Sequence, residues 1–284
     1  MSEKTKRVIN PGPYYMLATG IFFSIGGLCM KMVPWNALAI NSVRCVLSAM
    51  VMGIYVAISG GRLKFNKTIF KGALTIAFTT AVYAMAVKLT TAGAAIVIQF
   101  TAPVWVMLFS LLIYKKKPLK EDIITCIAVF FGIGLCFYDG LAAGRTLGNL
   151  LALVSGVTYG LVFMWNAGEN SDATSSVIIG QLMSAAVGIP FLVKESFSDL
   201  EPVALFCLFA LGVFQLGLGY VFMVMGLRTT PPVTACLITG IEPVLNPIWV
   251  ALFYGEKITP LFVAGGLLVL VSVTVYNIRA AKHG

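Results

Sequence analysis

The chain has 284 residues, of which 59% are hydrophobic and only 11% are charged. Soluble domains are about 25% charged, so the composition excludes an ordinary soluble fold and makes lipid the solvent for most of this chain. The formal net charge is +9, but the basic residues gather in short loops between apolar runs, which indicates membrane topology. We therefore expect an integral membrane protein whose partner is the lipid bilayer, and no binding of nucleic acid.

Ten apolar runs have the length of about 20 residues that crosses a bilayer core. In chain order, these predicted spans 1 to 10 cover residues 13–32, 36–58, 69–88, 92–114, 120–139, 147–167, 174–194, 202–226, 232–254 and 259–278. The runs are about twice as long as a barrel strand and do not alternate. The first run lacks a convincing small-residue cleavage site, so we expect an uncleaved span and not a signal peptide. The expected fold class is an all-α integral membrane protein with ten transmembrane helices.

The loops on one side of the membrane carry most of the positive charge. Of the 20 Lys and Arg residues, fourteen lie on the side that holds both chain ends, five lie on the other side, and Arg44 lies inside span 2. Cytoplasmic loops carry an excess of Lys and Arg. We therefore predict that both termini face the cytoplasm, as short tails at 1–12 and 279–284.

The two halves of the chain repeat each other at an offset of 140 residues. Ala95 aligns with Ala235, and Pro103 aligns with Pro243, in one register that runs from a loop through a span into the next loop. The predicted repeats are residues 13–139 and 147–278, joined by a connecting loop at 140–146. Five spans per repeat force the second copy into the membrane upside down. Inverted repeats are typical of alternating-access transporters, which bind solute near the midplane at the repeat interface.

Three stretches carry a family resemblance. They are "NSVRCVLSAM" in span 2, "TACLITGIEPVLNPIWVALFYGEKIT" in span 9 and "AGGLLVLVSVTVY" in span 10. With the two five-span halves, they resemble the EamA-type transporters of the drug/metabolite transporter superfamily. The resemblance implies a multi-pass carrier of the bacterial inner membrane that exports amino acids or related small metabolites. One departure is that "LLIYKKKPLK" ends span 4 without an acid, so Glu256 after span 9 has no counterpart and could simply cap that span.

Prolines interrupt the same place in both halves. Pro103 in span 4 and Pro243 in span 9 lack an N–H, and each frees the carbonyl group four residues earlier, as Pro247 also does. Freed carbonyls at membrane depth need cover from protein or from a water-filled cavity, and paired helix breaks point to a transporter site. We expect a cavity beside spans 4 and 9, with kinks made only for packing as the alternative.

Glu242 lies near the middle of span 9, where a charge costs about 2.5–3.5 kcal/mol on insertion scales and usually marks a pathway. Three roles are open: a group that couples transport to protons, a counter-ion for a substrate ammonium group, and a structural partner for a buried cation. Arg44 is the available cation. It could instead bind a substrate carboxylate or reach toward a lipid headgroup.

Other polar and aromatic residues at mid-depth could line one cavity. The predicted substrate-binding set, beyond Glu242 and Arg44, is Gln99, Trp105, Asn246, Tyr83, Tyr159, Trp165 and Gln215. Gln181 and Tyr220 lie at similar depth, and the pair Gly156 and Gly160 has the spacing of a close helix contact.

Catalytic and cofactor-binding patterns are lacking in the sequence. The sole histidine, His283, lies on the tail, the acids form no paired motif near a span end, and the six cysteines fall inside apolar runs without a CxxC pair. We expect no enzyme, no cofactor and no metal site. The expected partner is a small-molecule substrate, with protons as a candidate coupling ion; a polytopic membrane enzyme and a lipid-carrier flippase remain the alternatives.

Overall fold

The fold was analysed in a computed structural model, which describes residues 10–115, 120–142, 145–167, 170–256 and 259–283. Parts of the predicted N-terminal tail (1–9) and connecting loop (143–144) lie outside the described residues. Within the described residues every secondary-structure element is a helix, as expected.

The helices of the first half follow the predicted spans closely. They are α1 Gly12–Ser24, α2 Gly26–Met32, α3 Ala37–Ser59, α4 Lys67–Leu89, α5 Ala92–Gln99, α6 Ala102–Tyr114 and α7 Lys120–Ala142. Span 1 thus consists of α1 and α2, and span 4 consists of α5 and α6.

The second half is more segmented. Its elements are α8 Thr146–Asn166, α9 Ala173–Leu192, η1 Phe197–Asp199, α10 Pro202–Ala210, η2 Leu211–Leu218, α11 Gly219–Gly226, α12 Pro232–Ile238, η3 Thr239–Ile241, α13 Glu242–Tyr254 and α14 Pro260–His283. Span 8 consists of α10, the π-helical η2 and α11, while span 9 consists of α12, η3 and α13.

Eight helices of the described part are long and apolar enough to cross a membrane. They correspond to every predicted span except spans 5 and 10, where α7 and α14 contain only the shorter apolar stretches Ile123–Leu135 and Pro260–Ser272. The expected multi-pass helical class is therefore confirmed, but the count of ten crossings is not.

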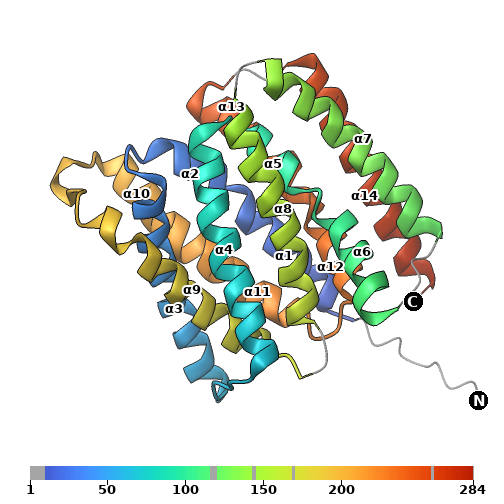
Figure 1. Cartoon of the computed structure of the whole chain (residues 1–284), viewed down its shortest axis with the longest axis horizontal. Coiled ribbons are helices and arrows are strands. Elements are labelled where there is room, and N and C mark those ends of the chain that lie inside the picture. Colours follow the sequence, from blue (N-terminus) through green and yellow to red (C-terminus); the bar gives the residue numbers. More distant parts are fainter. Residues whose placement is uncertain (1–9, 116–119, 143–144, 168–169, 257–258, 284) are drawn as a thin grey trace, which may run out of the picture.

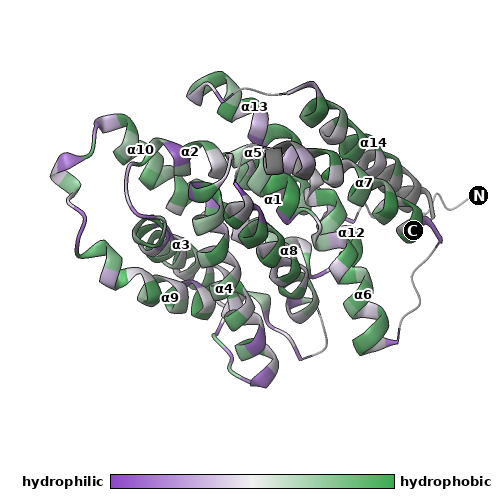
Figure 2. Ribbon diagram, turned by 45° about the horizontal axis from the view of Figure 1, so that its top comes forward, coloured by the Kyte–Doolittle hydropathy of each residue, from purple (hydrophilic) through white to green (hydrophobic). Residues whose placement is uncertain are grey.

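The hydrophobic surface has the distribution expected of a protein in lipid. Figure 2 shows hydrophobic residues along the helices and hydrophilic residues concentrated at helix ends and connections. Large side chains such as Ile54, Phe131 and Leu252 are more than half exposed, at 60%, 62% and 69%.

The packing of the helices follows the two-repeat arrangement. Span 2 packs on span 7 (α3 on α9) and span 5 on span 10 (α7 on α14), which are self-matching pairs under an exchange of the halves. Figure 1 shows these two pairs on opposite sides of the bundle. Span 1 packs against spans 8 and 9, and span 6 packs against spans 3 and 4. The first span of each half therefore packs against spans of the other half.

Candidate functional site

The two proline-containing spans are interrupted at corresponding places. Span 4 breaks between α5 and α6, at residues 100–101, and span 9 tightens into the 3₁₀ turn Thr239–Ile241. Pro103 and Pro243 each lie in the first turn of the following helix, where a missing N–H removes no helical bond. The interruptions thus lie beside Pro103 and Pro243, while Pro247 lies inside α13.

Neighbouring glycines cover the carbonyl groups at both breaks. A Cβ built on Gly20 would lie 3.1 Å from the carbonyl oxygen of Thr239, and one built on Gly156 would lie 2.7 Å from that of Gln99. In the 140-residue register Thr239 corresponds to Gln99, so the two contacts are equivalent. At these carbonyls a neighbouring helix takes the place that we expected a water-filled cavity to take.

Glu242 begins α13 and is buried, with 3% of its surface exposed, and its Oε2 has no hydrogen-bond partner. The positive end of the helix dipole favours a carboxylate at this position. Asn246 lies four residues later on the same helix face. It is 0% exposed, and neither atom of its amide has a partner. This face of α13 therefore presents unused donors and acceptors to the protein interior.

Two of the predicted amide side chains, those of Gln215 and Asn246, lie against the break in span 1. Between α1 and α2 the chain turns at Ile25, and a Cβ on Gly27 would lie 2.4 Å from Asn246 Oδ1, while one on Gly26 would lie 3.0 Å from Gln215 Nε2. Gln215 belongs to η2, and π-helical turns often occur at functional sites. Its Oε1 is buried without a partner. Spans 1, 8 and 9 thus bring Gln215 and Asn246 to one place.

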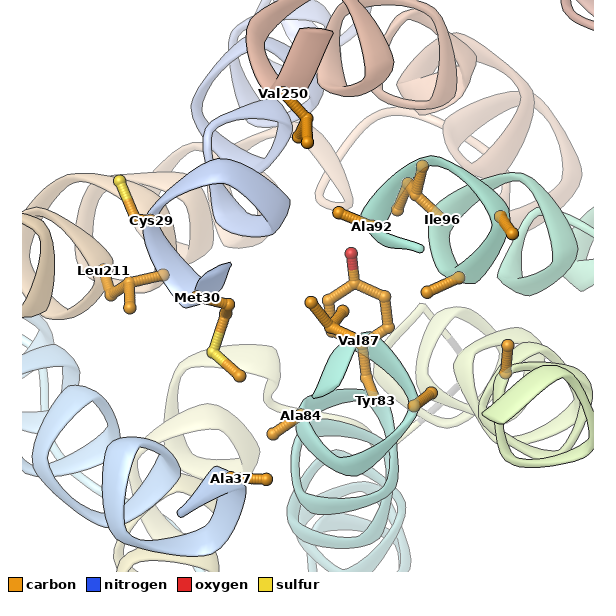
Figure 3. Close-up of a cluster of buried hydrophobic side chains, with 14 of the residues drawn as sticks. Cys29, Met30, Ala37, Tyr83, Ala84, Val87, Ala92, Ile96, Leu211 and Val250 are labelled. Atoms are coloured by element: carbon orange, nitrogen blue, oxygen red, sulfur yellow. The ribbon is translucent and has the colours of Figure 1, made fainter. Parts of the chain in front are cut away.

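Three tyrosines from both halves of the chain lie near Glu242. Tyr83 on α4, Tyr159 on α8 and Tyr220 on α11 each lie within electrostatic range of its carboxylate. The hydroxyl groups of Tyr83 and Tyr159 are buried and have no hydrogen-bond partner. Figure 3 shows the Tyr83 hydroxyl pointing away from α4, toward Ala92. Aromatic faces beside a carboxylate form a favourable environment for a cation.

Arg44 lies in a different network from Glu242. Its Nε and Nη2 donate to Asn41 Oδ1 at 3.1 and 2.9 Å, and Nη2 also donates to the Thr80 carbonyl at 2.9 Å. Asn41 in turn donates to Ser184 Oγ at 2.8 Å. Arg44 thus ties span 2 to spans 3 and 7. The structure gives no bond or ion pair between Arg44 and Glu242 in the part of the chain that it describes.

For the remaining predicted site residues, no bond to Glu242 or to the two amides is seen in the described part of the chain. Trp105 Nε1 donates to Thr101 Oγ1 at 3.3 Å, and its ring stacks on Phe109 along the contact with α8. Trp165 lies under the Lys71 ammonium, 4.8 Å from the ring centroid, at the end of α8. Gln99 is buried where α5 ends. Mid-depth position did not reveal which way these side chains point.

Sequence analysis missed Gly26 and Gly27, although they admit the two amides at the break in span 1. The available signal was a Gly-Gly pair inside an otherwise apolar run, since glycine marks places where another group approaches closely. No proline lies near this break to indicate it in the sequence.

A lipid-facing helical bundle with a buried polar cluster at paired helix breaks defines a multi-pass membrane protein. Comparison with family models matches residues 10–138 and 146–278 to the EamA-like transporter family. The chain belongs to this family, as the resemblance predicted.

A search of the curated proteins found no significant match. Among solved structures, one titled only "Crystal structure of protein" is similar with a TM-score of 0.74 at 14% sequence identity, covering 95% of this chain and 99% of its own. At this identity the likeness shows a shared fold alone.

Proposed function

We propose that the chain is a secondary transporter that exports a small metabolite, an amino acid or a related compound, across the bacterial inner membrane by alternating access. The observation that carries the proposal is the buried carboxylate of Glu242, whose Oε2 has no partner, on the same helix face as the unpartnered amide of Asn246. Membership of a transporter family supports the general class.

The cost of these groups argues for a function. A buried donor or acceptor without a partner costs about 1–3 kcal/mol, and more when it is charged. Packing alone would favour an apolar side chain at both positions. A ligand that supplies the missing partners explains why the polar groups are there.

Glu242 would hold the positive charge of the substrate or of a coupling proton. The three tyrosines offer aromatic faces and hydroxyl groups around it, and in the described part no lysine, arginine or histidine forms an ion pair with it. A substrate ammonium group and a proton are the two cations that fit such a site, and the experiment below separates them.

The test uses purified protein in proteoliposomes with a panel of labelled amino acids and amines. We expect directional flux of at least one intact solute. Glu242→Gln should abolish flux driven by a pH gradient but keep equilibrium exchange if Glu242 binds the coupling proton. It should weaken binding at every pH if Glu242 binds the substrate ammonium group.

The matched control is Glu201→Gln, which removes an exposed carboxylate before α10 and should leave flux unchanged. Chemical conversion of the solute would instead favour a membrane enzyme, and movement of labelled lipid alone would favour a flippase. If Glu242→Gln transports and binds as the parent does, the proposed role of the carboxylate is wrong.

A further inference from the structure

The packing described above forms two groups of spans: spans 1, 8 and 9, and spans 3, 4 and 6. Two lysines and one glutamate form hydrogen bonds between these groups at one end of the bundle. We call this end, where Lys31, Thr90 and Glu256 lie, the outer end, because the loop charges predict that it faces away from the cytoplasm. The opposite end is the inner end. Span 1 and span 9 belong to the group formed with span 8, whereas the turn at Thr90–Ala92 joins spans 3 and 4 of the other group.

The side chains of Lys31 and Glu256 close on this turn from the opposing group. Lys31 Nζ donates to the Thr90 carbonyl at 2.7 Å, and Glu256 Oε1 accepts from the Ala92 N–H at 3.4 Å. The two side chains also pair with each other at 3.7 Å, with 15% and 19% of their surfaces exposed. Lys31 and Glu256 thus bind the carbonyl group of Thr90 and the N–H group of Ala92, on either side of the turn.

A further hydrogen bond joins the same two groups of spans, and here the donor belongs to the group that contains spans 3 and 4. Lys88, at the end of span 3, donates to the Val33 carbonyl at 2.5 Å, just after span 1. The glutamate that follows span 9 is therefore more than a cap for its own helix, because it accepts from the first residue of α5.

Among the residues that the structure describes, the inner end shows no contacts that correspond to those of Lys31 and Glu256. The turn that matches Thr90–Ala92 at an offset of 140 is Thr230–Pro232, and Pro232 has no N–H to donate. The Thr230 hydroxyl is buried without a partner. Span 1 and span 6 correspond at an offset of 136 residues, because the contacts of Gly12 and Gly20 recur at Gly148 and Gly156. At this offset, the residue of the inner end that corresponds to Lys31 is Ala167.

A pocket lies at the inner end beside Ala167. It has a volume of about 290 Å³ and is lined by residues of α8, α9 and α11 and their connections, among them Asn166, Ala167, Asp172 and Arg228. Arg228 is the counterpart of Lys88 in the repeat. Among the described residues, hydrogen bonds thus join the two groups of spans at the outer end, and a pocket lined by both groups lies at the inner end.

We propose that Lys31 and Glu256 form a clamp on the Thr90–Ala92 turn that keeps the outer end shut, and that this clamp must release for the outer end to open. The clamp is a gate within the transport cycle, so its role in moving solute rests on the proposed function. Its position on the shut end is independent of which solute is carried.

The test measures access to the interior just below the clamp. Val250 is 0% exposed and points from α13 into the same cluster of buried side chains as Ala92 and Met30 (Figure 3). Val250→Cys supplies a thiol of similar size at this position. Its rate of reaction with a polar maleimide is measured in detergent-purified protein, above the background of the parent, whose five described cysteines are all buried.

Removing the clamp should expose this thiol. With Lys31→Met or Glu256→Ala, we expect the labelling rate to rise about tenfold or more, since each change removes charge-assisted bonds that favour the shut state. The double variant should label no faster than the faster single variant, because both side chains act on one turn. Glu256→Gln keeps an acceptor for Ala92 and should give a smaller rise.

The matched control removes the other ion pair of the described residues, between Lys64 and Asp172 at the inner end. Lys64→Met and Asp172→Asn should leave labelling at Val250→Cys unchanged. Variants are compared only when they elute as a single peak. If Glu256→Ala does not elute in this way, Glu256→Gln is used in its place.

The outcomes separate the clamp from the transport proposal. Labelling that stays at the parental rate in Lys31→Met and in every Glu256 variant overturns the clamp, even if solute crosses the bilayer. Accelerated labelling without flux of any solute leaves the clamp standing and overturns the transport proposal.

Discussion

The carbonyl oxygen of Thr239 lies against Gly20, so close that a Cβ on this glycine would come within 3.1 Å of it. The equivalent contact in the other half joins Gln99 to Gly156, with a corresponding distance of 2.7 Å. Two spans broken at the same place are thus covered in the same way, each by the first span of the opposite repeat. The repeat is a property of contacts as well as of sequence.

The glycine contacts predict a position-specific loss of stability. Gly156→Ala should lower the free energy of unfolding by about 1–3 kcal/mol, because the added methyl group would overpack against the Gln99 carbonyl and Thr101 Oγ1. Thermal unfolding in detergent is the measurement. Gly53→Ala is the control, since a Cβ there meets nothing within 4 Å, and it should be neutral or stabilising. Equal melting temperatures for both variants would contradict the close contact.

Asn246 should show opposite effects on stability and transport. Asn246→Leu removes two unpartnered polar atoms from the interior, so the melting temperature should stay or rise, while solute flux should fall about tenfold if those atoms bind solute. Trp105→Leu is the contrast. It disrupts the contact of α6 with α8 and should lower stability more than flux. Undiminished flux in Asn246→Leu would remove this residue from the site.

Arg44 should behave as a structural residue that is independent of Glu242. Arg44→Met breaks a buried network and should cost about 3–5 kcal/mol of stability, and Arg44→Lys cannot reproduce the planar fork that binds Asn41 and Thr80. Combined with Glu242→Gln, its effect on the melting temperature should be additive, because the two groups share no bond. Rescue of Glu242→Gln by Arg44→Met would instead show that the two charges are paired.

The predicted topology can be tested at two exposed lysines. Cysteines placed at Lys67, before span 3, and at Lys194, after span 7, should react with an impermeant reagent from opposite sides of the membrane. Labelling is done in intact cells and in inverted vesicles. Both positions reacting from one side would refute the assigned crossings, whereas reversed sidedness would refute only the placement of the termini.

Prolines and the repeat register were the parts of the site that could be predicted from sequence. Pro103 and Pro243 lack an N–H at matching positions, so interruptions in spans 4 and 9 were expected from covalent chemistry. The break at Ile25 could not be predicted in this way, since glycine permits a turn without requiring one.

Depth along a span was predictable, but direction around its axis was not. Asn246 and Trp105 both lie well inside apolar runs, yet one faces the buried cluster and the other lies along the contact of α6 with α8. Spans in lipid are apolar on nearly every side, so hydrophobic periodicity cannot orient them. Only the packing of several helices decides which polar side chains meet.

The exchange of first spans has a consequence for how the protein is made. Span 1 leaves the ribosome early, but the helices that cover its glycine-lined face, in spans 8 and 9, are synthesised near the end of the chain. Until then that face has lipid as its only neighbour, and the N-terminal half has no complete core of its own. Half-length products should therefore be degraded unless both are made together, and assembly of this membrane protein can finish only after its last spans have been inserted.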